Sequence, residues 1–162
     1  MQDSVAILST GGTIDKVYFD ASSDYQVGEP QIIEILRIVG AQVPFTVENI
    51  FRKDSLELTD DDRREIAERV RKTPSSRVLI THGTDTMVNT ARELTGIEGK
   101  TIVLVGSLTP ARFKNSDAEF NIGFAIAAVQ TLPPGVWIAM NGRVFAHDQV
   151  RKNKDLNRFE PA

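Results

Sequence analysis

Five short apolar runs, separated by segments of helical periodicity, are the feature of this 162-residue chain that most restricts its fold. The runs span residues 5–8, 45–51, 78–80, 102–105 and 136–140. Several of them lack the alternation of polar and apolar residues that a strand with one solvated face shows, so they are typical of strands buried on both faces. Such strands, alternating with helices, predict an α/β fold with a mostly parallel sheet flanked by helices.

Local signals predict where the elements between these runs begin and end. Pro30 suits the first position of a helix. Capping-box spacing predicts two further helix starts, at Thr59–Asp62 and at Ser116–Glu119, and Pro133-Pro134 ends the second of them. Asn141-Gly142 between two apolar pairs is typical of a type I′ turn, which predicts an antiparallel C-terminal hairpin after the last parallel strand.

The composition narrows the available chemistry. With no Cys and two His, thiol catalysis and disulfides are excluded, and we expect no metal and no cofactor. A net charge of -3 argues against a nucleic-acid partner held by bulk electrostatics. Because no apolar run approaches the ~20 residues of a membrane span and Met1-Gln2-Asp3 lacks a basic leader, we expect a cytoplasmic protein without a membrane partner.

Two threonine-bearing turns follow two of the predicted strands, Thr10-Gly11-Gly12-Thr13 and His82-Gly83-Thr84-Asp85-Thr86. In an open α/β sheet the ligand crevice lies outside the carboxyl ends of the strands, so the turns converge if their strands are neighbours. Nucleophilic attack by a threonine is the chemistry implied. The plainer alternatives are a flexible glycine turn and a Thr84 or Asp85 that only caps a helix beginning near Gly83. We expect His82 to be a partly buried, hydrogen-bonded residue and not a catalytic one.

Residues 14–28 are predicted to form a hairpin or lid that carries the only two tyrosines, Tyr18 and Tyr25. Either tyrosine could pack, or could hydrogen-bond to Thr13 and orient it. A threonine also needs a base, and a lysine kept neutral by burial would be suitable. Lys152 is the candidate, although the run at 151–154 can equally be a solvated charged stretch.

Taken together these motifs resemble the bacterial-type L-asparaginase family. The matching segments are 8–14, Tyr25 with 27–28, Asp54-Ser55, 80–87, 105–107 and 150–152. The resemblance runs from about residue 5 to residue 152 and covers only the larger N-terminal domain of that family. We therefore expect residues 1–162 to be a single domain of this type, a short-chain form of the family.

The resemblance implies an amidohydrolase that converts L-asparagine to L-aspartate and ammonia through an acyl-enzyme, with L-glutamine as a possible weaker substrate. Thr13 would be the nucleophile, oriented by Tyr25 or by its rival Tyr18. Thr84, Asp85 and Lys152 would form a hydrogen-bonded group that activates a hydroxyl or water.

The resemblance also implies a substrate site. Ser55 would hold the α-carboxylate and Asp85 the α-ammonium. The full set of expected substrate-binding residues is Gly12, Asp54, Ser55, Gly83, Thr84 and Asp85.

Some features depart from the family pattern. Leu56 stands where the family often has a polar residue, and a one-residue shift would exchange the roles of Arg151 and Lys152. Because full-length relatives complete the site with a neighbouring subunit's C-terminal domain, we expect a homodimer or higher homo-oligomer, in which Asp60 or Asp61 of a partner could close the pocket. The main alternative is a non-catalytic amino-acid-binding module or partner subunit. A phosphate-binding protein is disfavoured because the chain lacks G-x-x-x-x-G-K-[ST] and G-x-G-x-x-G.

Overall fold

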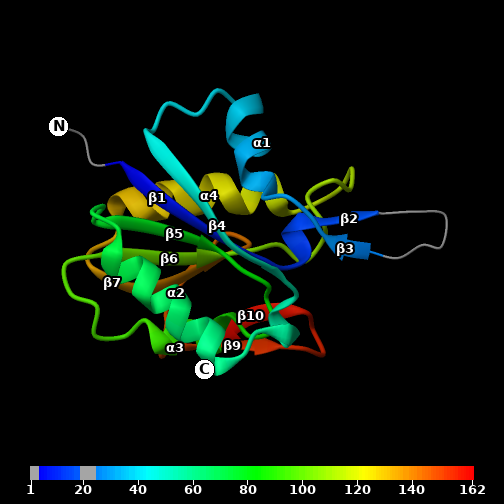
Figure 1. Ribbon diagram of the computed structural model, residues 1–162. Coiled ribbons are helices and arrows are strands. Elements are labelled where there is room, and N and C mark those ends of the chain that lie inside the picture. Colours follow the sequence, from blue (N-terminus) through cyan, green and yellow to red (C-terminus); the bar gives the residue numbers. More distant parts are fainter. Residues whose placement is uncertain (1–3, 19–24) are drawn as a thin grey trace.

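A single six-stranded sheet organises the molecule, for which the computed structural model describes residues 4–18 and 25–162 apart from the side chain of Tyr18 (Figure 1). Its strand order is β4-β1-β5-β6-β7-β8. The strands are β1 (Val5–Gly11), β4 (Phe45–Lys53), β5 (Arg77–Thr81), β6 (Thr101–Val105), β7 (Gly135–Met140) and β8 (Arg143–Ala146). All neighbours pair in parallel except β7 and β8. The predicted mostly parallel sheet, with the two threonine-bearing strands β1 and β5 side by side, is confirmed.

Helices cover both faces of this sheet, as Figure 1 shows. Helices α1 (Gln31–Ile38) and α4 (Ala118–Thr131) lie on one face, and α2 (Asp60–Lys72) and α3 (Met87–Glu93) on the other. The central strand β5 is consequently buried on both sides, with Val78, Leu79 and Ile80 fully inaccessible. Within the described residues, no helix is long and apolar enough to cross a membrane.

The observed starts of α2 and α4 can be compared with the two capping boxes predicted from the sequence. The Thr59–Asp62 capping box is confirmed, since the Asp62 N–H donates to Thr59 Oγ1 at 3.1 Å and the Thr59 N–H donates to Asp62 Oδ2 at 3.0 Å. The Ser116–Glu119 box is wrong, because α4 begins at Ala118 with Asp117 as its N-cap. The Asp117 carboxylate accepts the N–H groups of residues 108 and 109, so this segment anchors the loop after β6.

Two other helix starts also differ from the prediction. Helix α1 begins at Gln31, so Pro30 is the N-cap and not the first helical residue. Helix α3 begins at Met87, later than the predicted start near Gly83. The residues between are held in a non-helical turn, partly because the Thr86 hydroxyl donates to the Ser55 carbonyl at 2.8 Å. Asp85 therefore precedes the helix and does not lie in its first turn.

Three hairpins complete the fold. Strands β2 (Lys16–Tyr18) and β3 (Tyr25–Val27) form the predicted lid hairpin, of which residues 19–24 lie outside the described part. The turn between β7 and β8 has positive φ at Asn141 and Gly142, as a type I′ turn requires, which confirms the predicted C-terminal hairpin. Strands β9 (Val150–Asn153) and β10 (Arg158–Pro161) form a further hairpin that the sequence did not predict.

Candidate active site

The first threonine turn leaves the sheet where β1 ends. Gly11 and Gly12 have φ of 105° and 90°, a region that favours glycine, and Thr13 then opens a 3-10 turn over Thr13–Asp15. The two threonines have different surroundings. Thr10 is buried and donates to the Thr81 carbonyl at 2.8 Å, whereas Thr13 is half-buried and lines a surface hollow. Thr10 therefore joins the ends of β1 and β5, and Thr13 is the available hydroxyl.

Three turns meet at the carboxyl edge of the sheet. A Cβ placed on Gly12 would lie 2.4 Å from the Gly83 nitrogen. A Cβ placed on Gly83 would lie 2.6 Å from Ser55 Cβ and 2.8 Å from its Oγ. The turns that follow β1, β4 and β5 thus approach one another so closely that only glycine fits at positions 12 and 83. The predicted convergence of the two threonine turns is confirmed, and the Ser55 turn joins them.

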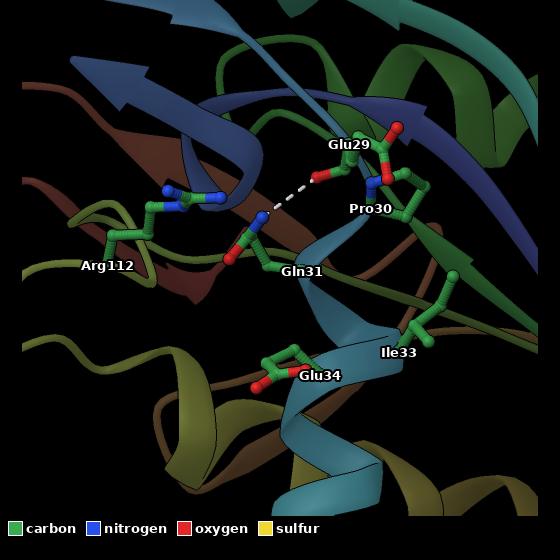
Figure 2. Close-up of a pocket in the computed structure, with 6 residues that line it drawn as sticks. All are labelled: Glu29, Pro30, Gln31, Ile33, Glu34 and Arg112. Atoms are coloured by element: carbon green, nitrogen blue, oxygen red, sulfur yellow. Dashed lines mark hydrogen bonds between the residues drawn. The ribbon is translucent and has the colours of Figure 1, made fainter.

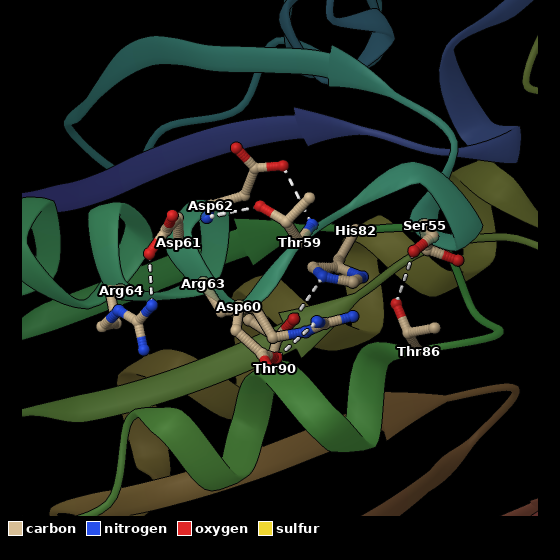
Figure 3. Close-up of polar contacts among 10 residues, drawn as sticks. All are labelled: Ser55, Thr59, Asp60, Asp61, Asp62, Arg63, Arg64, His82, Thr86 and Thr90. Atoms are coloured by element: carbon tan, nitrogen blue, oxygen red, sulfur yellow. Dashed lines mark hydrogen bonds and ion pairs between the residues drawn. The ribbon is translucent and has the colours of Figure 1, made fainter.

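A buried histidine supports the second turn from inside (Figure 3). His82 is fully buried, and its Nδ1 lies 2.6 Å from the Gly83 carbonyl oxygen while its Nε2 lies 2.7 Å from Thr90 Oγ1. Burial lowers the pKa of His82 to about 4, so the ring is neutral near pH 7. The expectation of a hydrogen-bonded histidine is confirmed, although the residue is fully and not partly buried.

Lys152 reaches the second turn from β9. Its Nζ donates to Thr84 Oγ1 at 2.8 Å and to Asp85 Oδ1 at 2.7 Å, and only 10% of its side chain is exposed. Arg151, by contrast, is exposed and pairs with Glu160 on β10. The strand alternation therefore turns Lys152 toward the site and Arg151 away from it. The three residues grouped by the sequence, Thr84, Asp85 and Lys152, are in direct contact.

The Ser55 turn follows β4 as a short 3-10 segment, Ser55–Glu57. Asp54 caps it by accepting the Leu56 N–H at 3.0 Å. Burial alone would raise the pKa of Asp54, but that hydrogen bond and the nearby charges of Lys16 and Lys152 hold it below its usual range. Ser55 itself is 1% exposed, and Leu56 points outward with 67% exposed.

The lid hairpin places Tyr25 beside the Thr13 turn. Tyr25 and Thr13 line the same hollow of about 300 Å³, together with Lys16 and with residues of the loop after β6, Leu108, Pro110 and Phe113. The Tyr25 and Phe113 rings lie 5.9 Å apart at 54°. The side chain of Tyr18 lies outside the described residues, although its backbone pairs with that of Tyr25.

A larger hollow of about 570 Å³ lies elsewhere, at the start of α1 (Figure 2). Its lining residues are Glu29, Pro30, Gln31, Ile33, Glu34 and Arg112. None of these six carries a hydroxyl or amine nucleophile, so we place the chemistry at the smaller hollow. Among the residues that the structure describes, no cluster of three His, Asp or Glu side chains is arranged to hold a metal ion.

Sequence reasoning missed two ionisable residues close to Thr13. Lys16 lines the same hollow as Thr13 and forms an ion pair with Asp54, their Nζ and Oδ2 atoms lying 3.2 Å apart. Asp15 is buried and accepts the Gln31 N–H at 2.8 Å, and its backbone carbonyl accepts the Gly28 N–H at 2.8 Å. The sequence shows that both residues lie close to Thr13 along the chain. Only the hairpin geometry shows that the Lys16 side chain lines the hollow and that the Asp15 side chain is buried.

Asp60 and Asp61, considered as groups that could close a partner's pocket, lie at the start of α2. Their side chains are 86% and 87% exposed and pair with Arg63 and Arg64 of the same helix (Figure 3). They therefore face solvent and not this chain's own hollow.

The fold and these contacts define an α/β protein whose hydroxyl, carboxylate and amine groups gather at the carboxyl edge of a parallel sheet. Comparison with known proteins gives the family. The family model described as "Asparaginase, N-terminal" matches residues 4–159. This chain belongs to the asparaginase family.

Individual relatives agree with this assignment. The chain is 31% identical to a glutaminase-asparaginase of Acinetobacter glutaminasificans, over 96% of this chain and 51% of the relative. It is 30% identical to one subunit of a glutamyl-tRNA(Gln) amidotransferase from Methanococcus vannielii, over 87% of this chain and 35% of that protein. A crystal structure of a probable cytoplasmic L-asparaginase from Campylobacter jejuni superposes with a TM-score of 0.83 at 28% identity, over 99% of this chain and 52% of that one. The chain thus spans about half the length, or less, of these relatives.

Proposed function

We propose that this chain hydrolyses the side-chain amide of L-asparagine, releasing L-aspartate and ammonia. The observation that carries the proposal is the contact of Lys152 with Thr84 and Asp85, at 2.8 and 2.7 Å, on a turn that abuts the Thr13 turn. A hydroxyl, an amine and a carboxylate in one hydrogen-bonded group beside a second free hydroxyl are what covalent amide hydrolysis requires. Family membership supports the same activity.

In the proposed reaction, Thr13 Oγ1 attacks the side-chain amide carbon and Tyr25 orients that hydroxyl. The hydroxyl proton of Thr13 is transferred to the amide nitrogen, and the tetrahedral intermediate then expels ammonia and leaves an ester between Thr13 and the aspartyl group. Water, activated by the Thr84, Asp85 and Lys152 group, then cleaves the ester, which frees Thr13 and releases aspartate. The Thr13 turn supports this role because it is held by backbone contacts and leaves its hydroxyl unburied.

Substrate recognition follows from the charges at the same edge. We assign the α-ammonium to Asp85 Oδ2, since Oδ1 accepts from Lys152. Ser55 and the Asp54 turn form the side that receives the α-carboxylate, and Gly12 and Gly83 admit the substrate close to the backbone. L-glutamine is the proposed weaker substrate, in keeping with the glutaminase-asparaginase relative.

A second candidate is a non-catalytic amino-acid-binding module or partner subunit. The resemblance to an amidotransferase subunit favours it, as does the fact that this chain spans only part of its relatives. The presence of Thr13 together with the complete Thr84, Asp85 and Lys152 group favours the enzyme.

Assembly is also a proposal. We propose that residues 1–162 act as one domain within a homo-oligomer that uses the outer face of α4. Phe120 is 61% exposed there and stacks on Phe124 with ring centroids 6.3 Å apart. Exposed aromatic groups of this size, on a helix apolar on nearly every side, favour burial against another surface.

The deciding experiment is ammonia release from L-asparagine by the purified chain, followed with wild type and the Thr13→Ala variant. Turnover that disappears in the variant supports the enzyme. Tight binding of L-aspartate without any ammonia release would instead favour the binding module.

A further inference from the structure

We propose that Lys16 is a specificity-determining residue whose ammonium group binds the carboxylate of the substrate, so that the site selects amides bearing a free carboxylate. This inference rests on the proposed amidase function and adds a residue to it. Lys16 begins the lid strand β2, three residues after Thr13.

The position of Lys16 is fixed by Asp54. The ion pair between Lys16 Nζ and Asp54 Oδ2, at 3.2 Å, joins the lid hairpin to the turn that carries Ser55. The Lys16 side chain is 28% exposed, so its ammonium is neither sealed in the protein nor free in solvent. A lysine ammonium has three N–H donors, and one bond to Asp54 leaves donors for a ligand.

Two adjoining hollows are both lined by Lys16 and Tyr25. One, of about 300 Å³, also contains Thr13. The other, of about 400 Å³, contains Asp54 and Arg52. Lys16 is therefore placed where the space beside the nucleophile meets the space beside the Ser55 turn.

The surrounding charges alternate. Lys16 pairs with Asp54, Asp54 is also within electrostatic range of Lys152, and Lys152 pairs with Asp85. A zwitterionic amino acid matches this order, with its ammonium toward Asp85 and its carboxylate toward Lys16. The reversed orientation would place like charges together at both ends.

Burial explains why a cation is needed at this end. Ser55 is 1% exposed and packs against Gly83, so it can offer the carboxylate a single hydroxyl and no positive charge. A carboxylate leaving water loses strong hydration, and a charge-assisted hydrogen bond compensates for this better than a single buried hydroxyl does. Lys16 supplies that bond from the wall of the hollow.

The test compares two substrates that differ only in the group Lys16 would bind, L-asparagine and L-asparagine α-methyl ester, in which the side-chain amide is the only source of ammonia. The variants are Lys16→Gln, the charge-retaining Lys16→Arg, and Lys72→Gln as a control at the exposed end of α2. Ammonia release gives kcat and KM for each protein with each substrate, and circular dichroism checks that each variant is folded.

We expect Lys16→Gln to lower kcat/KM for L-asparagine about 10- to 30-fold, mainly through KM, because a hydrogen bond to a charged group is lost. The same variant should leave kcat/KM for the α-methyl ester within about twofold of wild type, and Lys16→Arg should recover most of the loss on L-asparagine. Equal losses on both substrates would overturn the proposal, because Lys16 would then act by holding the hairpin. No loss on either would also overturn it.

Failure of the amidase function is distinguished by calorimetric binding of L-aspartate. If wild type releases no ammonia but binds L-aspartate, the amidase function fails. Weaker L-aspartate binding by Lys16→Gln, but not by Lys16→Arg or Lys72→Gln, would still support the role of Lys16. Unchanged L-aspartate binding by Lys16→Gln, or no L-aspartate binding by wild type, would overturn the proposed role of Lys16.

Discussion

Gly12 and Gly83 lie in direct backbone contact, so close that a Cβ on Gly12 would fall 2.4 Å from the Gly83 nitrogen and 2.5 Å from its Cα. This contact brings the Thr13 turn and the Thr84 turn together without any intervening side chain. The two turns lie 71 residues apart in sequence but at the ends of adjacent strands, as the pairing of Ser9 with Thr81 and the bond from Thr10 to Thr81 show. Substitution at this contact should therefore separate the two proposed catalytic groups.

We predict that Gly12→Ala is more damaging than Gly96→Ala. Both glycines have positive φ, 90° and 84°, so alanine has a conformational cost of at least about 1–2 kcal/mol at each, and Gly12, with ψ of -176°, lies in a region that is essentially limited to glycine. Only Gly12 has atoms in the space of the new Cβ, since nothing lies within 4 Å at Gly96. Urea unfolding should show a larger loss for Gly12→Ala, and kcat should fall at least about tenfold in that variant alone. Equal effects of the two substitutions would contradict the close-contact argument.

Most of the sheet could be predicted because its strands are apolar throughout. The run at 78–80 has no polar residue and lies fully buried between two helical layers, so sequence and environment agree. The β9–β10 hairpin could not be predicted, because β9 reads Val150-Arg151-Lys152-Asn153 and lacks a clear apolar face. Its strand conformation depends on pairing with β10 and on the bonds that Lys152 makes to the Thr84 turn.

The site was predictable in part for similar reasons. Glycine and threonine at strand ends indicate the turns directly, whereas the start of α3 depends on the hydrogen bond from Thr86 to Ser55, a partner 31 residues away. The Ser116–Glu119 prediction failed for the same reason, since the loop after β6 occupies the Asp117 carboxylate and the Ser116 hydroxyl. Asp15 and Lys16 carry no local pattern, and only the hairpin's direction reveals their roles.

We predict that Thr13→Ala abolishes turnover of L-asparagine, by about a thousandfold or more, while leaving stability nearly unchanged. The reason is that Thr13 lies on a half-buried turn outside the core. Thr10→Val is the matched variant, because it removes a hydroxyl of the same turn that bonds the Thr81 carbonyl. It should lower the free energy of unfolding by about 0.5–1.5 kcal/mol and keep most of the activity. Turnover by Thr13→Ala within a few-fold of wild type would exclude Thr13 as nucleophile.

The Thr84, Asp85 and Lys152 group should behave as a unit. Thr84→Val and Lys152→Met are each expected to lower kcat about a hundredfold, and the double variant should lose little more, because either change disrupts the same hydrogen-bonded group. Lys152→Arg should also fail, since a planar guanidinium cannot reproduce the geometry of the two bonds that the lysine amine makes to Thr84 and Asp85. Strictly multiplicative losses in a double-mutant cycle on kcat, or an active Lys152→Arg, would contradict this.

Asp15 should make stability depend on pH. Burial raises its pKa to about 7 from 3.8, although the Gln31 N–H, Ser9 and Arg52 favour the charged form. The folded protein therefore holds this proton more tightly than the unfolded chain, so the stability contributed by Asp15 falls as pH rises from about 4 to 7. Asp15→Asn keeps an acceptor for Gln31 and carries no charge. It should match wild type at about pH 4 and exceed it by about 1–3 kcal/mol at about pH 8.

His82 changes the stability in the opposite direction over much of the same pH range. Wild type must therefore be compared with the Asp15→Asn variant at each pH. The pKa of His82 is lowered to about 4 from 6.5 by burial, which means its contribution is present above pH 6.5 and is lost as pH falls toward 4. Because this contribution is common to wild type and Asp15→Asn, it cancels in their difference. Urea unfolding at several pH values measures that difference, and a difference independent of pH would exclude Asp15 as its source.

The final prediction concerns the α4 face. Phe120 and Phe124 stack with their rings nearly parallel, at 7°, and a Cβ on Gly142 would lie 3.6 Å from the Phe120 ring, so helix and hairpin form one surface. If this surface is shared between copies of the chain, Phe120→Asp should shift the protein toward monomer at micromolar concentration, because a charge would be buried in an apolar contact. Leu156→Asp serves as a control for an exposed apolar residue away from α4 and from the Thr13 hollow. Sedimentation velocity measures both variants, and a wild type that is already monomeric and fully active would refute the oligomer and mean that one chain completes its own site.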